Sequence, residues 1–180
     1  MRVITGKARG VQLKTPEGMQ TRPTADRVKE ALFSIINFDL PGAAVLDLFG
    51  GTGQLGIEAL SRGARSAVFV DAREDACKII RENLRRTKLE GDGRVVRSDY
   101  LDYLRRTREK FDIVLLDPPY AEVFLENALK CITEIDILQS GGIIVAERPV
   151  EKELPFEFEG YTRSRDYKYG KTLLTIYRKD

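Results

Sequence analysis

The chain has 180 residues, of which 42% are hydrophobic and 32% are charged, as in an ordinary globular domain. It contains no histidine, which excludes serine–histidine and cysteine–histidine hydrolysis and the usual zinc sites, so carboxylates, backbone groups and aromatic rings must carry any chemistry. No apolar run is long enough to span a membrane and no signal-peptide pattern opens the chain, so we expect a cytoplasmic protein that uses neither a membrane nor a metal.

The net charge is only +2, but the charges are unevenly distributed. Residues 1–40 hold seven Lys and Arg against four Asp and Glu, and residues 161–180 hold six against two. The stretch between them is acidic. Two interpretations are open: the basic ends are solvated surface, or both ends contact a polyanion.

The first forty residues predict a short extension. Residues 2–15 alternate apolar and polar positions around a basic turn that is bounded by glycines, which predicts a β-hairpin. Residues 24–37 place apolar side chains at helical spacing, with Thr24 as the expected N-cap.

From residue 41 onward, strands and helices alternate. Strands are predicted at 41–49, 66–71, 94–99, 111–117 and 143–149, and helices at 50–64, 73–89, 100–110 and 122–135. This alternation is typical of an α/β domain with a Rossmann-like, doubly wound and mostly parallel sheet. Residues 161–179 end the chain as two strands joined by a glycine-containing turn, hence an antiparallel hairpin. We expect an extension at 1–40 and one α/β domain at 41–180.

The segment VLDLFGGTGQLG, residues 45–56, joins a predicted strand to a predicted helix. Gly51, Gly53 and Gly56 fit the G-x-G-x-x-G pattern, and Asp71 ends the next strand twenty positions after Gly51. The glycines follow a strand and precede a helix, and an acid ends the next strand. This arrangement indicates a nucleotide cofactor whose ribose hydroxyls donate hydrogen bonds to the acid.

The glycine pattern alone does not separate NAD from S-adenosylmethionine. Asp47 lies just before the glycines, where a carboxylate would repel a pyrophosphate but attract the ammonium and sulfonium groups of S-adenosylmethionine. This favours S-adenosylmethionine. Asp99 is expected to accept from the adenine amino group, with Tyr100 beside it, and Asp99 can also cap the helix that follows.

The segment FDIVLLDPPY, residues 111–120, ends a buried strand with an acid, two prolines and a tyrosine. Pro118 and Pro119 cannot continue a central strand, so they hold the neighbouring acid in a stiff loop at the edge of the sheet. We expect the Asp117 carboxylate and the Pro118 carbonyl to accept the two hydrogens of a planar amino group, while Tyr120 stacks on the base that carries it. This predicts methyl transfer to an exocyclic amine.

These segments resemble a known family. DPPY is similar to the amino-methyltransferase signature of class I S-adenosylmethionine-dependent enzymes, and TRPTADRVKEALF, residues 21–33, together with the two segments above, resembles the RsmD-type family over nearly the whole chain. The resemblance implies a seven-stranded sheet with an antiparallel last strand. It also implies that Arg22 and Thr24 close over the methionine end of the cofactor.

The resemblance further implies methylation of guanine N2 in small-subunit (16S) ribosomal RNA, by a monomer acting on a partly assembled small subunit. Three other functions are open: a DNA adenine or protein glutamine methyltransferase with the same loop, a silent RNA-binding module, and an NAD-dependent dehydrogenase. The basic side chains expected to neutralise RNA phosphates are Lys7, Arg9, Lys14, Arg163, Arg165, Lys168 and Lys171.

Overall fold

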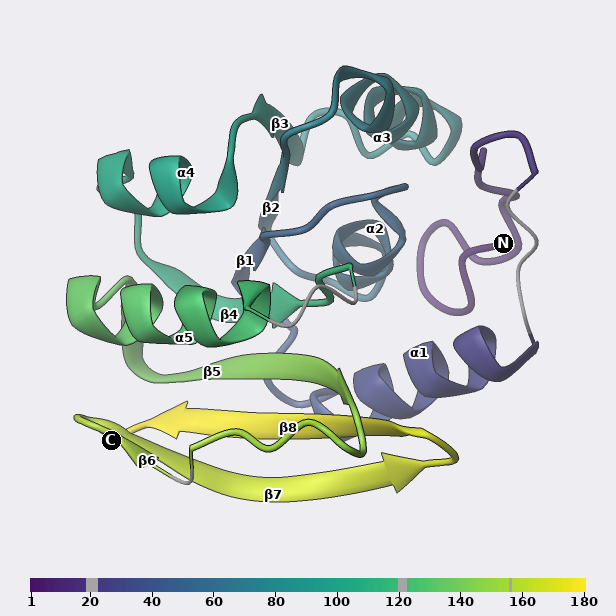
Figure 1. Ribbon diagram of the computed structural model, residues 1–180. Helices are drawn as coiled ribbons and strands as arrows, with labels where there is room; N and C mark the ends of the chain where they lie inside the picture. Colours follow the sequence, from purple (N-terminus) through teal and green to yellow (C-terminus); the bar gives the residue numbers. More distant parts are fainter. Residues whose placement is uncertain (19–22, 120–122, 156) are drawn as a thin grey trace.

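The fold is a twisted sheet covered by helices on both faces (Figure 1). The computed structural model describes residues 1–18, 23–119, 123–155 and 157–180, without the side chains of Pro23 and Thr24. Within these residues, eight strands form one sheet in the order β3-β2-β1-β4-β5-β8-β7-β6. The strands are β1 Ala44–Asp47, β2 Ser66–Asp71, β3 Gly93–Arg97, β4 Phe111–Leu116, β5 Leu138–Pro149, β6 Glu157–Phe158, β7 Tyr161–Tyr169 and β8 Thr172–Lys179.

Strands β1 to β5 are parallel to one another, and β8 lies between β5 and β7, antiparallel to both. The predicted doubly wound α/β fold is therefore confirmed. The chain moves outward from β1 through β2 to β3 and then returns to β4 on the other side of β1. This reversal places the switch in strand order between β1 and β4, where ligands bind in sheets of this kind.

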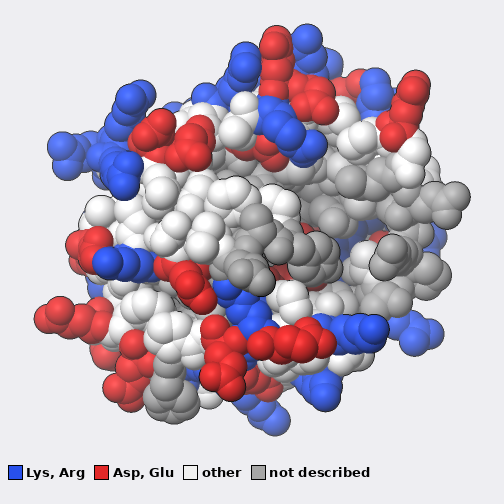
Figure 2. All heavy atoms as spheres, viewed as in Figure 1, with Lys and Arg blue, Asp and Glu red and all other residues white. Residues whose placement is uncertain are grey.

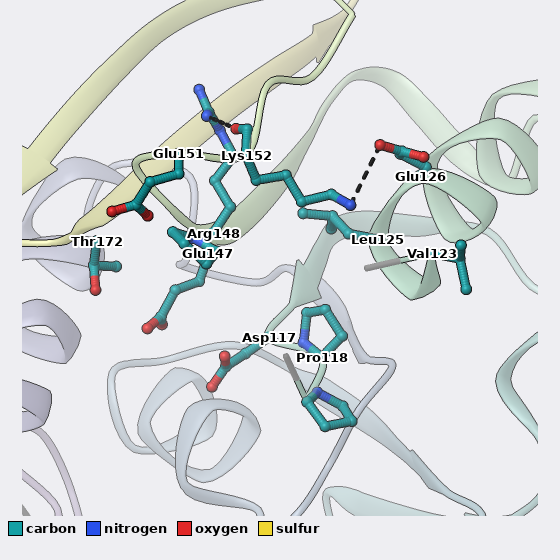
Figure 3. A pocket seen from close by; sticks show the side chains of 12 residues that line it. Asp117, Pro118, Val123, Leu125, Glu126, Glu147, Arg148, Glu151, Lys152 and Thr172 are labelled. Carbon is teal, nitrogen blue, oxygen red and sulfur yellow. Dashed lines mark hydrogen bonds and ion pairs between the residues drawn. The ribbon is translucent and has the colours of Figure 1, made fainter. Parts of the chain in front are cut away.

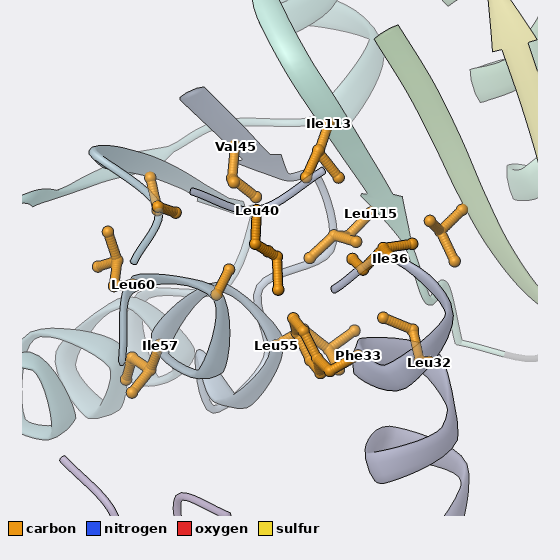
Figure 4. Close-up of a cluster of buried hydrophobic side chains, with 14 of the residues drawn as sticks. Leu32, Phe33, Ile36, Leu40, Val45, Leu55, Ile57, Leu60, Ile113 and Leu115 are labelled. Carbon is orange, nitrogen blue, oxygen red and sulfur yellow. The ribbon is translucent and has the colours of Figure 1, made fainter. Parts of the chain in front are cut away.

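The helices divide between the two faces of the sheet. They are α1 Pro23–Ile35, α2 Gln54–Ser61, α3 Glu74–Arg86, α4 Tyr100–Arg106 and α5 Phe124–Ile135. Helices α1, α2 and α3 share one hydrophobic cluster with the N-terminal segment, and α4 and α5 share the other. Figure 4 shows the centre of the first cluster, where Phe33 of α1 and Ile36, which directly follows that helix, pack near Leu55 of α2 and Leu115 of β4.

The predicted N-terminal hairpin forms only one antiparallel bridge, between Arg2 and Gln12. Buried polar groups of the helices also hold the segment. Glu58 of α2 is fully buried and accepts hydrogen bonds from the N–H groups of Ile4 and Thr5, at 2.9 and 3.0 Å. Backbone hydrogen bonds also join the two arms of the segment, from the N–H of Val3 to the carbonyl of Val11 at 3.0 Å and from the N–H of Leu13 to the carbonyl of Met1 at 2.9 Å. Helix side chains and these backbone bonds therefore hold the N-terminal segment together.

Asn83 of α3 joins this segment to the glycine loop. Its carbonyl oxygen accepts from the N–H of Lys14 at 2.6 Å, and its amide nitrogen donates to the carbonyls of Lys14 and Thr52, at 3.0 and 2.9 Å. One buried side chain thus bonds two segments that lie far apart in the sequence.

The C-terminal part of the sheet differs from the expectation in two places. A two-residue strand, β6, adds an eighth strand at the edge. Strand β5 begins at Leu138, so the glycines at 141 and 142 lie inside it rather than in a loop before it. Its register with β4 shifts between Phe111 and Ile113, and Gly141 has a φ of +73°. The glycines therefore form an irregularity in a strand, not its boundary.

On the face seen in Figure 2, acidic and basic side chains are interspersed over the described surface. No helix in the described part of the chain has the length and apolar character needed to cross a bilayer.

Candidate functional site

The expected rim of acids lies at the carboxyl ends of the parallel strands. Asp47 ends β1, Asp71 ends β2, Asp117 follows β4 directly, and Asp99 follows β3 after one residue. Because parallel strands end on the same edge of the sheet, these four side chains come from one side of it. All four line a single cavity of about 570 Å³.

This first cavity has the size of a site for a nucleoside-sized ligand. Its walls come from four strand ends, the glycine loop and the start of α5. The lining residues include Gly50, Gly51, Thr52, Gln54, Phe49, Asp47, Asp71, Arg73, Asp99, Tyr100, Asp117, Pro119 and Phe124. Arg73 is the basic side chain among them, and it lies 3.4 Å from Asp71.

The glycine loop is fixed by the acids on either side of it. The N–H of Gly51 donates to Asp71 at 2.9 Å, and the N–H of Gly56 donates to Asp47 at 3.0 Å. Gly53 stands at the start of α2 with a φ of +81°, a conformation that favours glycine. Gly51 reaches the cavity, whereas Gly53 shapes the turn beneath it.

Asp47 is the most deeply buried of these acids, with 1% of its surface exposed. Its pKa is raised to about 8, chiefly by burial; the hydrogen bond from Gly56 lowers the pKa, and the charges of Asp117 and Asp71 contribute to raising it. Among the described residues, Asp47 has no ion-pair partner. A cationic ligand in the cavity would supply the missing counter-charge.

Asp99 caps helix α4, which is the second of its two expected roles. Its carboxylate accepts from the N–H groups of Leu101 and Asp102, at 2.9 and 3.1 Å. Tyr100, the next residue, packs its ring 5.1 Å from Phe49 and 5.4 Å from Phe124. The three rings form an aromatic wall at one end of the first cavity, suited to a flat group such as adenine.

A second cavity of about 460 Å³ lies on the other side of the proline loop. Asp117 and Pro119 line both cavities, and Pro118 lines the second. Burial raises the pKa of Asp117 to about 6. Figure 3 shows the Asp117 carboxylate and the Pro118 ring at the floor of this second cavity.

Sequence reasoning missed one acid of this site, Glu147. It lies near the end of β5, lines the second cavity, and has its pKa raised to about 8 by burial and by the charge of Asp117. The rule that found the other four acids, a carboxylate at the end of a predicted strand, could also have found Glu147 in IIVAERP.

The basic side chains expected to meet RNA fall into two groups. Lys7, Arg9, Lys168 and Lys171 are exposed. The other three are engaged in contacts within the chain, and of these Lys14 and Arg165 are exposed as well. Lys14 pairs with Glu82 at 2.8 Å, Arg163 pairs with Asp166, and Arg165 lies 5.1 Å from the centre of the Tyr167 ring.

Three expected site residues cannot be placed in this geometry. Arg22 and Tyr120 lie outside the described residues, as does the side chain of Thr24. The backbone of α1 begins at Pro23, so Thr24 occupies its first turn rather than the N-cap position.

Comparison with known sequences yields a family match over nearly the whole chain. Residues 1–178 match the family model described as "Conserved hypothetical protein 95". The "Putative rRNA methyltransferase YlbH" of Bacillus subtilis (strain 168) is 41% identical over 182 residues, which cover 99% of this chain and 99% of the relative. The "Ribosomal RNA small subunit methyltransferase D" of Escherichia coli (strain K12) is 32% identical over 180 residues, covering 100% of this chain and 90% of the relative.

Comparison with solved structures agrees with the sequence match. The structure titled "Putative methyltransferase yhhF from Escherichia coli" superposes with a TM-score of 0.91 at 30% sequence identity. The superposition covers 100% of this chain and 98% of that one. The likeness therefore extends to the N-terminal segment and to the C-terminal strands as well as the central sheet.

Proposed function

The chain belongs to the RsmD-type family, described as conserved hypothetical protein 95, and we propose that it transfers a methyl group from S-adenosylmethionine to the N2 amino group of a guanine in small-subunit ribosomal RNA. The observation that carries this proposal is the proline loop shared by two cavities. One cavity suits a cationic nucleoside, the other has room for a base, and Asp117 faces both. The names of the relatives support RNA of the small subunit as the substrate.

The residues of the first cavity fit S-adenosylmethionine. Asp71 would accept from the ribose hydroxyls, Asp99 and the aromatic wall would hold the adenine, and Gly51 leaves room for close backbone approach. Asp47, buried without a counter-charge, would face the cationic methionine end. When bound, S-adenosylmethionine supplies a methyl group on a sulfonium, which is an electrophilic carbon that needs no acid catalyst.

The chain itself must prepare the accepting amine. The lone pair of guanine N2 is delocalised into the ring, so the amine is a poor nucleophile. Asp117 and the carbonyl of Pro118 would accept its two hydrogens, which favours a more pyramidal nitrogen whose lone pair points at the methyl donor. Consecutive prolines restrict the loop, so little ordering is needed when the base binds.

Asp117 is also suited to receive the proton that the amine loses. The N–C bond at N2 would form as the S–C bond of the donor breaks, with S-adenosylhomocysteine as the leaving group, and the Asp117 carboxylate would accept the surplus proton of that nitrogen. Because burial raises the pKa of Asp117 to about 6, the group lies near the working pH, where a general base is most effective. This accounts for amine methylation in a chain without histidine.

We propose further that the exposed Lys7, Arg9, Lys168 and Lys171 bind phosphates of the RNA. We propose a partly assembled small subunit as the substrate, as the resemblance to the RsmD-type family implies. The protein would act as a monomer in the cytoplasm.

The proposal is tested with S-adenosylmethionine carrying a labelled methyl group. The purified chain is incubated separately with small subunits from cells that lack the protein, with naked ribosomal RNA, with DNA and with protein. We expect label in the small subunits, released on digestion as N2-methylguanosine. Label in DNA as methyladenine, or in protein as methylglutamine, would replace the proposal with one of those activities.

A further inference from the structure

The acid missed by sequence reasoning, Glu147, shares the second cavity with Asp117, whose charge acts on it. Strands β4 and β5 pair in parallel, with Leu115 opposite Val145 and Leu116 opposite Ala146. One step further along the same register, Asp117 is next to Glu147. Residues side by side on parallel strands point to the same face, about 4.8 Å apart. Figure 3 shows both carboxylates directed to the same side of the second cavity.

Glu147 is partly buried, and within the described part of the chain its carboxylate has no hydrogen bond or ion pair. The next residue, Arg148, does not neutralise it. The Arg148 guanidinium is engaged with Thr175 at 2.8 Å and with Asp166 at 3.0 Å. A partly buried carboxylate that faces a cavity and has no donor within the described residues is available to a donor that a ligand brings.

Two adjacent carboxylates match two adjacent donors. If the proposed function holds, guanine enters this cavity with its N2 amino group toward Asp117. The ring atom next to that amine carries a hydrogen, N1–H, so guanine presents two neighbouring donors. In adenine and cytosine the ring nitrogen beside the exocyclic amine has a lone pair instead, which a carboxylate would repel.

We propose that Glu147 determines the specificity for guanine, by accepting a hydrogen bond from N1–H while Asp117 and the Pro118 carbonyl hold the amine. This inference rests on the proposed function and extends it to the choice of base. Burial and the charge of Asp117 raise the pKa of Glu147 to about 8, so without a ligand the protonated carboxyl is favoured. A hydrogen bond from N1–H would lower that pKa on binding, because an N–H donor stabilises the ionised form.

The test replaces the target guanine with 2-aminopurine, which keeps the amine but has a lone pair in place of N1–H. Small subunits are rebuilt with ribosomal RNA that carries either base at the methylated position, once that position has been mapped. Wild-type protein and Glu147→Ala are compared on both substrates by kcat/KM. Glu153→Ala, an exposed glutamate of the following loop, is the control.

We expect wild type to prefer guanine by roughly 10- to 150-fold, the range for a hydrogen bond to a charged group. In Glu147→Ala this preference falls roughly 10- to 150-fold through loss of activity on guanine, whereas Glu153→Ala keeps the preference. The loss of the O6 atom in 2-aminopurine affects every variant equally, so it cancels from the ratio of the preferences of two variants.

The outcomes separate this inference from the function on which it rests. If wild type places no methyl group on guanine, the proposed function fails. If wild type methylates guanine and Glu147→Ala keeps the full preference over 2-aminopurine, only the role of Glu147 is refuted. Thermal unfolding and binding of S-adenosylhomocysteine confirm that each variant is folded, because the first cavity does not include Glu147.

Discussion

Replacing Asp47 by asparagine is expected to flatten the dependence of stability on pH. Burial holds the pKa of Asp47 at about 8 in the folded chain, against 3.8 as the ordinary value. Between these values the folded state keeps a proton that the unfolded state has released. The group therefore contributes stability that is fully present below pH 3.8 and is lost as the pH rises through about 8.

The magnitude follows from the linkage between proton binding and unfolding. When only the folded state retains a proton, the free energy of unfolding falls by about 1.4 kcal/mol for each unit by which the pH rises. Between pH 5 and pH 7, Asp47 should therefore lower the free energy of unfolding by about 2.8 kcal/mol. The asparagine side chain of the variant has no such proton but keeps an oxygen that can accept the hydrogen bond from Gly56, so the local turn is preserved.

The measurement is urea unfolding of wild type and Asp47→Asn at pH 5, 6 and 7, without ligand. The pKa values of Asp117 and Glu147 are also raised, to about 6 and 8. These two acids therefore also lower the free energy of unfolding as the pH rises, and they do so in both proteins. The difference in slope between the two proteins thus isolates Asp47. The exposed Asp92, replaced by asparagine, is the control and should leave the slope as in wild type. Equal slopes for Asp47→Asn and wild type would refute the buried, protonated state of Asp47.

Three other substitutions test the proline loop, the N-terminal segment and the RNA surface. Asp117→Ala should lower kcat by ~10²–10⁴-fold while calorimetric binding of S-adenosylhomocysteine stays within a few-fold; turnover close to wild type would mean that the amine is held elsewhere. Gly6→Ala should destabilise the chain by ~1–3 kcal/mol more than Gly10→Ala in thermal unfolding. Both glycines have a positive φ, but only a Cβ at Gly6 would meet backbone, at 1.8 Å. Equal losses of stability in the two variants would show that this contact relaxes. Lys168→Ala should reduce the salt dependence of RNA binding by ~0.7 log units per phosphate contact. Arg163→Ala breaks a contact with Asp166 and should instead lower the stability of the fold. An unchanged salt dependence of binding in Lys168→Ala would mean that Lys168 does not contact the RNA.

The rim of acids could be predicted because it depends only on local pattern. Asp47, Asp71 and Asp117 each follow a run of apolar residues that is too short for a helix, and glycine or proline bounds the runs at Asp47 and Asp117. Once the alternation of strands and helices indicates a parallel sheet, all strand ends of one direction must share an edge. The positions of these acids therefore followed without any knowledge of strand order.

The roles of Asp47 and Asp71 in the turn could not be predicted in the same way. Both acids were expected to face the cofactor, yet each also accepts a hydrogen bond from an N–H of the glycine loop or of helix α2. Such bonds depend on the path of the backbone within one turn, which the spacing of glycines does not determine.

The basic residues show the same limit. Arg163 and Lys168 look alike in a list of charges near the C-terminus. A bulge in β7 near Arg163 and the register with β8 bring Arg163 against Asp166, while Lys168 remains exposed. A count of charges indicates a basic segment but does not say which of its members are free to bind RNA.

The alternating elements, the glycine loop and the stiff acid–proline turn could all be read from the amino-acid order, because each arises from residues close together along the chain. The position of Glu147 beside Asp117, and the attachment of the N-terminal segment to Glu58 and Asn83, emerged from the folded arrangement instead. These contacts join residues separated by about thirty to seventy positions, and they exist only once strand order and register are fixed by the packing of the whole sheet.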